Sequence, residues 1–231
     1  MTEIHRAEDR GRGDHGWLTT RYSFSFADWF EPSRMGFGAL RVINDDTIAA
    51  GAGFPPHAHK DMEIITIVME GAVAHKDSAG GEGVTKAGEV QVMSAGTGVV
   101  HSEYNASKID TLALFQIWIQ TKKPGAEPRY AQKAIPEGLM VAPIGSPEEA
   151  VGALGIHQDA YITRGHSEEG TSFRYTLHDG SHGVYVFLIS GTAQVRDAAL
   201  SARDAVAITG ETALEVKGDA NFLLIEVPLS A

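Results

Sequence analysis

The chain has 231 residues, of which 43 % are hydrophobic and 21 % are charged, proportions that are usual for one large or two small globular domains. Its formal net charge is −11, without a cluster of Lys and Arg, so we expect no direct nucleic-acid partner. The absence of cysteine excludes disulfides, thiolate metal sites and cysteine nucleophiles. We expect a cytoplasmic protein, since no apolar run reaches about 18 residues and residues 1–16 lack the apolar core of a signal peptide.

Most of the chain is predicted to form short β-strands, rich in β-branched and aromatic residues and separated by turn clusters such as KDSAGGEG. In chain order the clearest are ALRVIN (39–44), EIITIVM (63–69), EVQVM (89–93), TLALFQIWI (111–119), GVYVFLI (183–189) and NFLLIEVPL (221–229). This spacing predicts an all-β protein built as a sandwich or barrel. The best helix signal is SPEEAVGAL (146–154), in which Ser146 can cap the helix and Pro147 can occupy its first position.

A faint internal repeat predicts two domains. Three segments of the first half resemble, in the same order, three segments of the second half: 71–77 and 191–197, 86–93 and 201–208, 110–119 and 219–229. We therefore expect two tandem barrels, residues 1–132 and 133–231, joined through the Pro- and Gly-containing stretch 122–138. Closed barrels leave few free strand edges, so we expect the two to pack face to face and the chain to be a monomer.

Two pairs of polar residues are candidates for a metal site. In FPPHAHKDMEIITIV (54–68), His57 and His59 face the same way if the segment is extended, which the preceding prolines favour. SAGTGVVHSEYN (94–105) offers His101 and Glu103 at the same spacing. A single strand histidine is typically a structural polar residue. Two such pairs on different strands instead favour a metal centre inside one barrel.

The donor set limits the metal without selecting it. Three neutral imidazoles and one carboxylate around a divalent ion leave a net charge of about +1, which suits an anionic ligand atom at an open position. In the absence of thiolates, the site fits one ion of iron, nickel, copper, manganese or zinc.

These two stretches resemble the first and second cupin motifs, and their departures from the general cupin pattern resemble the pirin family. Gly71 comes one residue late, Ser94 replaces a proline, and the glycine spacing before His101 is stretched. Together with SFSFADWFEP, GALRVINDD and HKDSAG, the two motifs resemble a bacterial pirin of the subgroup described as quercetin 2,3-dioxygenase. The resemblance is dense from about residue 15 to residue 130 and thin beyond.

The resemblance implies a bicupin, two cupin barrels in one chain, with a metal-free second barrel. It implies His57, His59, His101 and Glu103 as metal ligands, the same four that the spacing selects, and we expect iron. The implied activity is a metal-dependent dioxygenase that opens the central ring of a flavonol such as quercetin with O2 and releases carbon monoxide. Glu103, a ligand that can also accept a proton, is the candidate catalytic base.

An alternative function is a non-catalytic metal or redox sensor that acts through a protein partner, as eukaryotic pirins do. The two functions are distinguished by the surroundings of the metal. An aromatic-walled cavity that reaches the metal favours the enzyme, whereas a metal sealed from solvent favours the sensor.

Several other residues carry weaker expectations. Glu63 matches the ligand glutamate of the general cupin motif, and we expect it inside the barrel beside the ligands, with coordination as the alternative. We expect His75 at the surface near a hairpin, and His5 and His15 to be structural or solvated. His178 and His182 do not have the ligand spacing, so a complete second site is not expected. The aromatic residues near the N-terminus are candidates for the wall of a ligand pocket, but we expect most of them to fill the core: Phe24, Phe26, Trp29, Phe30 and Phe37.

Overall fold

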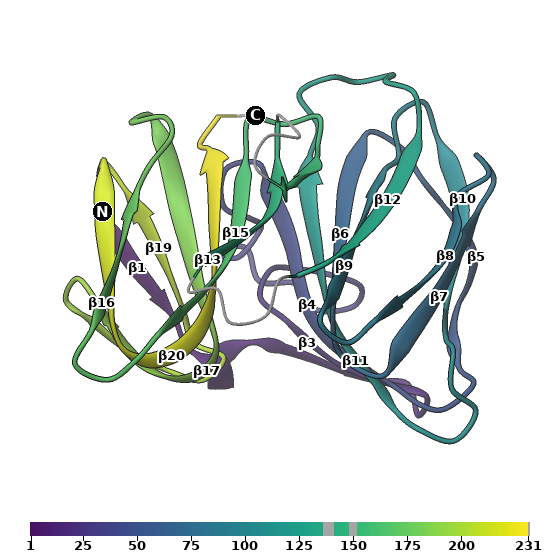
Figure 1. The fold of residues 1–231 in the computed structure, drawn as a ribbon, viewed down its shortest axis with the longest axis horizontal. Helices are drawn as coiled ribbons and strands as arrows, with labels where there is room; N and C mark the ends of the chain where they lie inside the picture. The colour runs from purple at the N-terminus through teal and green to yellow at the C-terminus, as the bar shows by residue number, and fades with distance from the viewer. Residues whose placement is uncertain (136–140, 148–151, 231) are drawn as a thin grey trace.

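Strands make up nearly all of the regular structure in the computed structural model, which describes residues 1–135, 141–147 and 152–230. They form a seven-stranded sheet and a four-stranded sheet in the N-terminal half and a nine-stranded sheet in the C-terminal half. The 3₁₀-helix η1 (Ala7–Asp9) lies near the N-terminus. No helix in the described part of the chain is long and apolar enough to cross a membrane. The predicted all-β architecture of two barrels is confirmed (Figure 1).

The N-terminal barrel consists of two facing antiparallel sheets. The larger sheet has the strand order β12-β9-β6-β11-β4-β3-β2 and the smaller one has the order β5-β10-β7-β8. The strands of the larger sheet are β2 (Gly11–Asp14), β3 (Leu18–Tyr22), β4 (Leu40–Ile48), β6 (Met62–Glu70), β9 (Glu89–Ser94), β11 (Leu112–Gln120) and β12 (Arg129–Ala134). Those of the smaller sheet are β5 (Gly53–His59), β7 (Ala72–Asp77), β8 (Glu82–Lys86) and β10 (Val99–Asn105).

The C-terminal barrel is built around two long strands, β17 (His182–Val195) and β20 (Ala213–Pro228), which pair along their lengths. The first part of β17 pairs with β19 and the last part with β18, so one strand contributes to both sides of the barrel. The other strands are β1 (Thr2–His5), β13 (Val141–Ser146), β14 (Leu154–Gly155), β15 (Tyr161–Ser167), β16 (Ser172–Thr176), β18 (Ala198–Ser201) and β19 (Ala205–Thr209).

Three local features differ from simple expectations. Strand β1 begins the chain but pairs with β19 of the C-terminal barrel, where the buried His5 lies 2.9 Å from the Tyr185 hydroxyl through its Nδ1 atom. Strand β12 lies inside the stretch expected to join the domains and pairs with β9. The predicted helix at 146–154 begins on the last residue of β13 and ends on the first of β14, and its centre, 148–151, lies outside the described residues.

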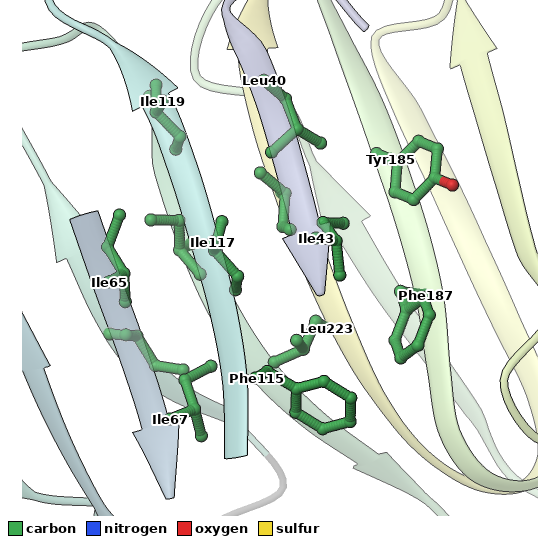
Figure 2. Close-up of a cluster of buried hydrophobic side chains, with 14 of the residues drawn as sticks. Leu40, Ile43, Ile65, Ile67, Phe115, Ile117, Ile119, Tyr185, Phe187 and Leu223 are labelled. Atoms are coloured by element: carbon green, nitrogen blue, oxygen red, sulfur yellow. The ribbon is translucent and has the colours of Figure 1, made fainter. Parts of the chain in front are cut away.

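The largest apolar cluster lies between the two barrels (Figure 2). Alternation along β4, β6 and β11 turns one set of side chains outward, including Ile43, Ile65 and Phe115, which meet residues of the C-terminal sheet such as Phe187. The Phe115 and Phe187 rings contact edge to face at 5.4 Å. The burial of each such side chain contributes about 1.5–3 kcal/mol to stability. Because the cluster joins side chains of both barrels, the expected face-to-face packing is confirmed. The alternate residues of the same strands face the interior of the N-terminal barrel.

Candidate metal centre and cavity

A cavity of about 330 Å³ lies inside the N-terminal barrel between its two sheets. Its walls are mostly aromatic and aliphatic, and several polar side chains project into it. The exposed Pro55 lies at its rim and the buried Glu103 lies in its interior. The lining comprises Leu18, Thr20, Tyr22, Phe26, Asn44, Asp46, Phe54, Pro55, His57, His59, His101, Glu103, Gln116 and Trp118.

The structure brings the three expected histidines together at one side of this cavity. His57 and His59 lie on β5, and His101 lies on the antiparallel neighbour β10, directly opposite His57. The Nε2 atoms of His57 and His101 are 3.0 Å apart, and the His59 ring centre is 5.0 Å from that of His101. The pleat turns all three rings to one side, as the two-residue spacing predicts.

The outer hydrogen bonds of the histidines determine which nitrogen is free. His57 Nδ1 lies 2.8 Å from the Pro55 carbonyl oxygen and can only donate to it. In a neutral His75 that donates from Nε2 to Asp77 across 2.9 Å, Nδ1 is the acceptor that faces His101 Nδ1 at 3.4 Å. His57 and His101 therefore both direct unprotonated Nε2 atoms at the same point.

This tautomer pattern fits a shared cation. Two lone pairs 3.0 Å apart repel each other, whereas two nitrogens each about 2.1 Å from one ion would be separated by about 3 Å at a right angle. Burial, reinforced by the neighbouring histidines, lowers the pKa of His59 to about 4 and that of His101 to about 3. Both rings are neutral at physiological pH, which is the form that binds metal.

Glu103 was expected to join these three histidines, but it lies deeper in the barrel, beside His101 and His75. A second potential metal-binding group contains Glu103, His101 and His75, with the ligand atoms within 4.8 Å of one another. His101 thus belongs both to this group and to the group formed with His57 and His59. The pairing of β5 with β10 shifts register between His101 and Glu103, which separates the carboxylate from the β5 histidines.

The Glu103 carboxylate is held by a set of uncharged donors. Gln91 Nε2 and Gln116 Nε2 each donate across 2.7 Å, and the Thr66 hydroxyl donates across 3.2 Å. Burial raises the pKa of Glu103, while the nearby His75 and the hydrogen bonds from Gln116 and Thr66 oppose that rise. A buried carboxylate with a raised pKa is a better proton acceptor than an exposed one.

Thr66, Gln91 and Gln116 were not identified from the sequence. They lie side by side on β6, β9 and β11, because Gln116 pairs with Thr66 and Thr66 pairs with Gln91. All three are buried. The available signal was a polar residue at an inward-facing position of each strand otherwise rich in apolar residues: EIITIV, EVQVM and LFQIWI.

The expectation that His75 lies at the surface was wrong. Its side chain is fully covered, stacks on Tyr130 with ring centres 4.3 Å apart, and has Nε2 within hydrogen-bond distance of Asp77 at 2.9 Å. Tyr130 belongs to β12, far away in the sequence, and the hairpin position alone gave no sign of this cover. His75 supports His101 from behind, as carboxylate–histidine chains do around metal ligands.

The expected position of Glu63 was also wrong. On β6 the residues Ile64 and Thr66 face the barrel interior, so Glu63 shares the opposite face with Ile65. Its carboxylate accepts a hydrogen bond from Ser94 Oγ at 2.6 Å. Burial raises the pKa of Glu63, and the contacts that oppose this rise come from Ser94, His157 and Arg129. Glu63 is therefore part of the contact region between the barrels and not of the cavity.

In the C-terminal barrel, His178 and His182 meet around the buried Glu226. The Nδ1 atoms of both rings lie 3.0 Å from its carboxylate, and the Tyr175 hydroxyl donates to it across 2.7 Å. The backbone N–H groups of His178 and Asp179 donate to the same carboxylate. These contacts fix the turn that precedes β17.

Of the aromatic residues near the N-terminus, Phe26 lines the cavity, where its ring contacts Trp118 edge to face at 5.3 Å. Phe24 and Phe37 belong to the cluster between the barrels, and Phe30 is exposed. The other aromatic walls, which the sequence did not single out, come from Tyr22, Phe54 and Trp118.

Two cupin barrels in one chain, with convergent imidazoles inside the first, define a bicupin protein that can hold a metal ion. The comparisons with known proteins then give the family. A sequence model of the pirin family matches residues 4–119, and one described as the quercetinase C-terminal cupin domain matches residues 143–227. The chain belongs to the pirin family.

Several relatives match over essentially the whole chain. A Pseudomonas aeruginosa protein, named provisionally as a quercetin 2,3-dioxygenase, is 46 % identical over 98 % of this chain and 100 % of its own. A protein of Escherichia coli K12 named quercetin 2,3-dioxygenase is 40 % identical, with 99 % of each chain covered. The crystal structure of the E. coli bacterial pirin YhhW in complex with nickel(II) is 40 % identical, with a TM-score of 0.94 and 99 % of each chain covered.

Proposed function

We propose that this protein is a metal-dependent dioxygenase that opens the central ring of a flavonol such as quercetin with O2. The observation that carries the proposal is the aromatic-walled cavity that reaches the three histidines. Its volume of about 330 Å³ lies within the range of small-molecule sites. In the reaction both atoms of O2 enter the product, a depside, and one carbon of the central ring leaves as carbon monoxide.

The proposed ligands of one divalent ion per chain are His57, His59, His101 and Glu103. The convergent Nε2 atoms of His57 and His101 and the neutral state of His59 and His101 support this assignment. We propose iron, and the nickel in the E. coli relative shows that a close relative also accepts another divalent metal. When bound, the ion would supply Lewis acidity toward the flavonol 3-hydroxyl and a redox-active contact for O2.

The protein side chains would bind the substrate and move its proton. Phe26, Phe54 and Trp118 would contact the flat rings and exclude water from them. Glu103, whose pKa burial raises, would accept the proton of the 3-hydroxyl. The amides of Gln91 and Gln116 would keep this carboxylate in place while it does so.

Metal analysis and oxygen uptake together test the proposal. Protein purified without chelators should contain one equivalent of metal, consume O2 with quercetin and release carbon monoxide. His57→Ala and His101→Ala should lose both the metal and the uptake, whereas His15→Ala, a change at an exposed residue, should keep both. A fully loaded wild type that consumes no O2 would refute the enzyme and favour the alternative of a metal or redox sensor with a protein partner.

A further inference from the structure

A group of buried polar side chains lies in the cavity wall formed by β3 and β4, outside the proposed metal ligands. Thr20, Asn44 and Asp46 all line the cavity. They are 1 %, 5 % and 2 % exposed, respectively. Thr20 on β3 pairs directly with Asp46 on β4. Burial of three polar side chains in one apolar wall costs free energy unless they gain hydrogen bonds.

One oxygen atom of each of these side chains lacks such a bond within the described part of the chain. Among the described residues, Thr20 Oγ1, Asn44 Oδ1 and Asp46 Oδ1 have no hydrogen-bond partner of good geometry. Nearly all buried polar atoms in native proteins are paired, so each exception requires an explanation. Glu103 in the same cavity receives three hydrogen bonds from neighbouring side chains. The contrast indicates that the β3–β4 wall is arranged for a group that enters the cavity.

The position of this wall relative to the histidines follows from strand pairing. Asn44 lies directly opposite Gln116, and Gln116 donates to Glu103. Neighbouring strands are about 4.8 Å apart, so the polar surface continues from Glu103 across β11 and β4 to Thr20 on β3. A ligand held at the histidines can therefore extend along this surface, with Phe54 and Trp118 among the apolar residues that line the same cavity.

We propose that Thr20, Asn44 and Asp46 form a subsite that accepts hydrogen bonds from phenolic hydroxyls on the part of the substrate remote from the metal. The identity of the ligand rests on the proposed function, whereas the subsite rests on the unpartnered atoms. The Asn44 and Asp46 oxygens accept, and the Thr20 hydroxyl can accept or donate. Phenolic hydroxyls supply the missing donors, so the subsite selects polyhydroxylated flavonols over flavonols with unsubstituted outer rings.

The carboxyl of Asp46 suits this role in either protonation state. Burial raises its pKa to about 7, with smaller contributions from the Asp45 and Glu103 charges and opposing ones from Thr20 and Arg10. At neutral pH the group is therefore partly protonated. Each form retains an oxygen that can accept a hydrogen bond.

Binding without turnover tests the subsite. Metal-loaded protein is titrated under anaerobic conditions with quercetin and with 3-hydroxyflavone, which keeps the 3-hydroxyl but lacks the other hydroxyls. Tryptophan fluorescence reports binding, because Trp118 lines the cavity. Wild type should bind quercetin at least about 10-fold more tightly than 3-hydroxyflavone. Asp46→Ala should lose this preference while it keeps its affinity for 3-hydroxyflavone, and Thr20→Val should lose part of it.

Asp45→Asn is the matched control, since Asp45 directly precedes Asp46 on β4 and faces away from the cavity. It should keep the full preference for quercetin. A preference that survives Asp46→Ala, equal binding of the two flavonols by wild type, or no binding of either would overturn the subsite. Asp46→Asn gives a second readout, because it should retain or raise the melting temperature, whereas a purely structural Asp46 would make it fall. A preference that depends on Asp46, found together with no O2 uptake, would support the subsite and refute the ring-opening reaction.

Discussion

Asp45 and Asp46 are consecutive residues of β4 that serve opposite faces of the sheet. Asp45 Oδ2 accepts a hydrogen bond from Arg203 Nε of the C-terminal barrel across 2.7 Å, and Arg10 approaches the same oxygen at 3.4 Å. Asp46 lines the cavity with its Oδ1 unpartnered among the described residues. Because a strand alternates its side chains, one dipeptide supports both the contact between the barrels and the proposed substrate site. Substitutions at the two positions should therefore have separable effects.

Asp45→Asn should destabilise the protein without a change in the cavity. Loss of the charge weakens the hydrogen bonds from Arg203 and Arg10, and since Asp45 and Arg203 are partly exposed the cost should be about 1–2 kcal/mol. Urea denaturation of wild type and variant at the same metal content measures the difference. An unchanged free energy of unfolding would mean that this ion pair contributes nothing measurable.

Asp46→Asn should have a pH-dependent effect of the opposite sign. The pKa of Asp46 is about 7 in the folded protein against 3.8 in its reference state, so the folded state keeps a proton that the unfolded state releases. Wild type therefore loses stability from this group as pH rises through the window between those values. The asparagine variant does not titrate, and its stability relative to wild type should increase from about pH 4 to about pH 7, by a few kcal/mol at most.

The measurement is a pair of urea titrations at each pH, with the two proteins at the same metal content so that metal linkage cancels. Asp45→Asn serves as the comparison here too, since it removes the neighbouring carboxylate, which does not line the cavity. A gap between Asp46→Asn and wild type that stays constant with pH would show that Asp46 is ionised throughout the range.

Phe115→Ala should destabilise the contact between the barrels strongly. The ring is fully buried, contacts Phe187 at 5.4 Å and has the Arg203 guanidinium 5.1 Å from its centre. Removal of such a side chain costs about 3–5 kcal/mol. Phe30→Ala, at a ring that is 70 % exposed, should change the free energy of unfolding by less than about 0.5 kcal/mol. Similar losses for the two variants in thermal or urea unfolding would contradict this assignment of the core.

The strands and the grouping of the three histidines could be predicted because both depend on local periodicity. His57 and His59 share one strand, and so do His101 and Glu103. The alternation of inward-facing and outward-facing residues does not continue across a turn of the chain. The loop between β5 and β6 includes Asp61 with a φ of 50°, and it resets which residues face inward. Glu63 therefore lies on the other face of the sheet, although its distance in sequence from His59 is even.

Long-range pairing accounts for what the sequence did not reveal. His75 is buried by Tyr130, which reaches it because β12 adds to the sheet beside β9. The donors to Glu103 come from β6, β9 and β11, and their alignment depends on the register of three strands. A single polar residue in an apolar strand can be recognised in the sequence. That three such residues lie side by side depends on the strand register, which the sequence does not show.

His75→Gln should weaken metal binding without abolishing it. His75 does not belong to the group formed by His57, His59 and His101, and it contacts His101 Nδ1 from behind while it donates to Asp77. Loss of such outer partners typically costs about 10–100-fold in metal affinity. Competition with a chelator measures the affinity, and His15→Ala provides the control. Complete loss of the metal would instead identify His75 as a ligand, in the group with His101 and Glu103.

Glu103→Gln should separate the two roles proposed for Glu103. An amide oxygen can still coordinate weakly, so much of the metal should remain. Turnover should fall by about 10²- to 10⁴-fold, as is typical for the loss of a general base. The new amide also meets two amide donors, Gln91 Nε2 and Gln116 Nε2, and its single oxygen cannot accept fully from both. Besides the loss of turnover, we therefore expect the free energy of unfolding to fall by about 1–3 kcal/mol.

The measurements on this variant are metal content, anaerobic binding of quercetin and oxygen uptake. Bound metal and bound quercetin with little uptake would identify Glu103 as the base. Turnover near the wild-type rate once metal is restored would make Glu103 only a ligand, and the proton would then leave by another route. Glu63 cannot provide that route, since its carboxylate lies on the other face of the sheet, where it accepts a hydrogen bond from Ser94. Asp46, which lines the cavity and has a pKa of about 7, would then be the next residue to substitute.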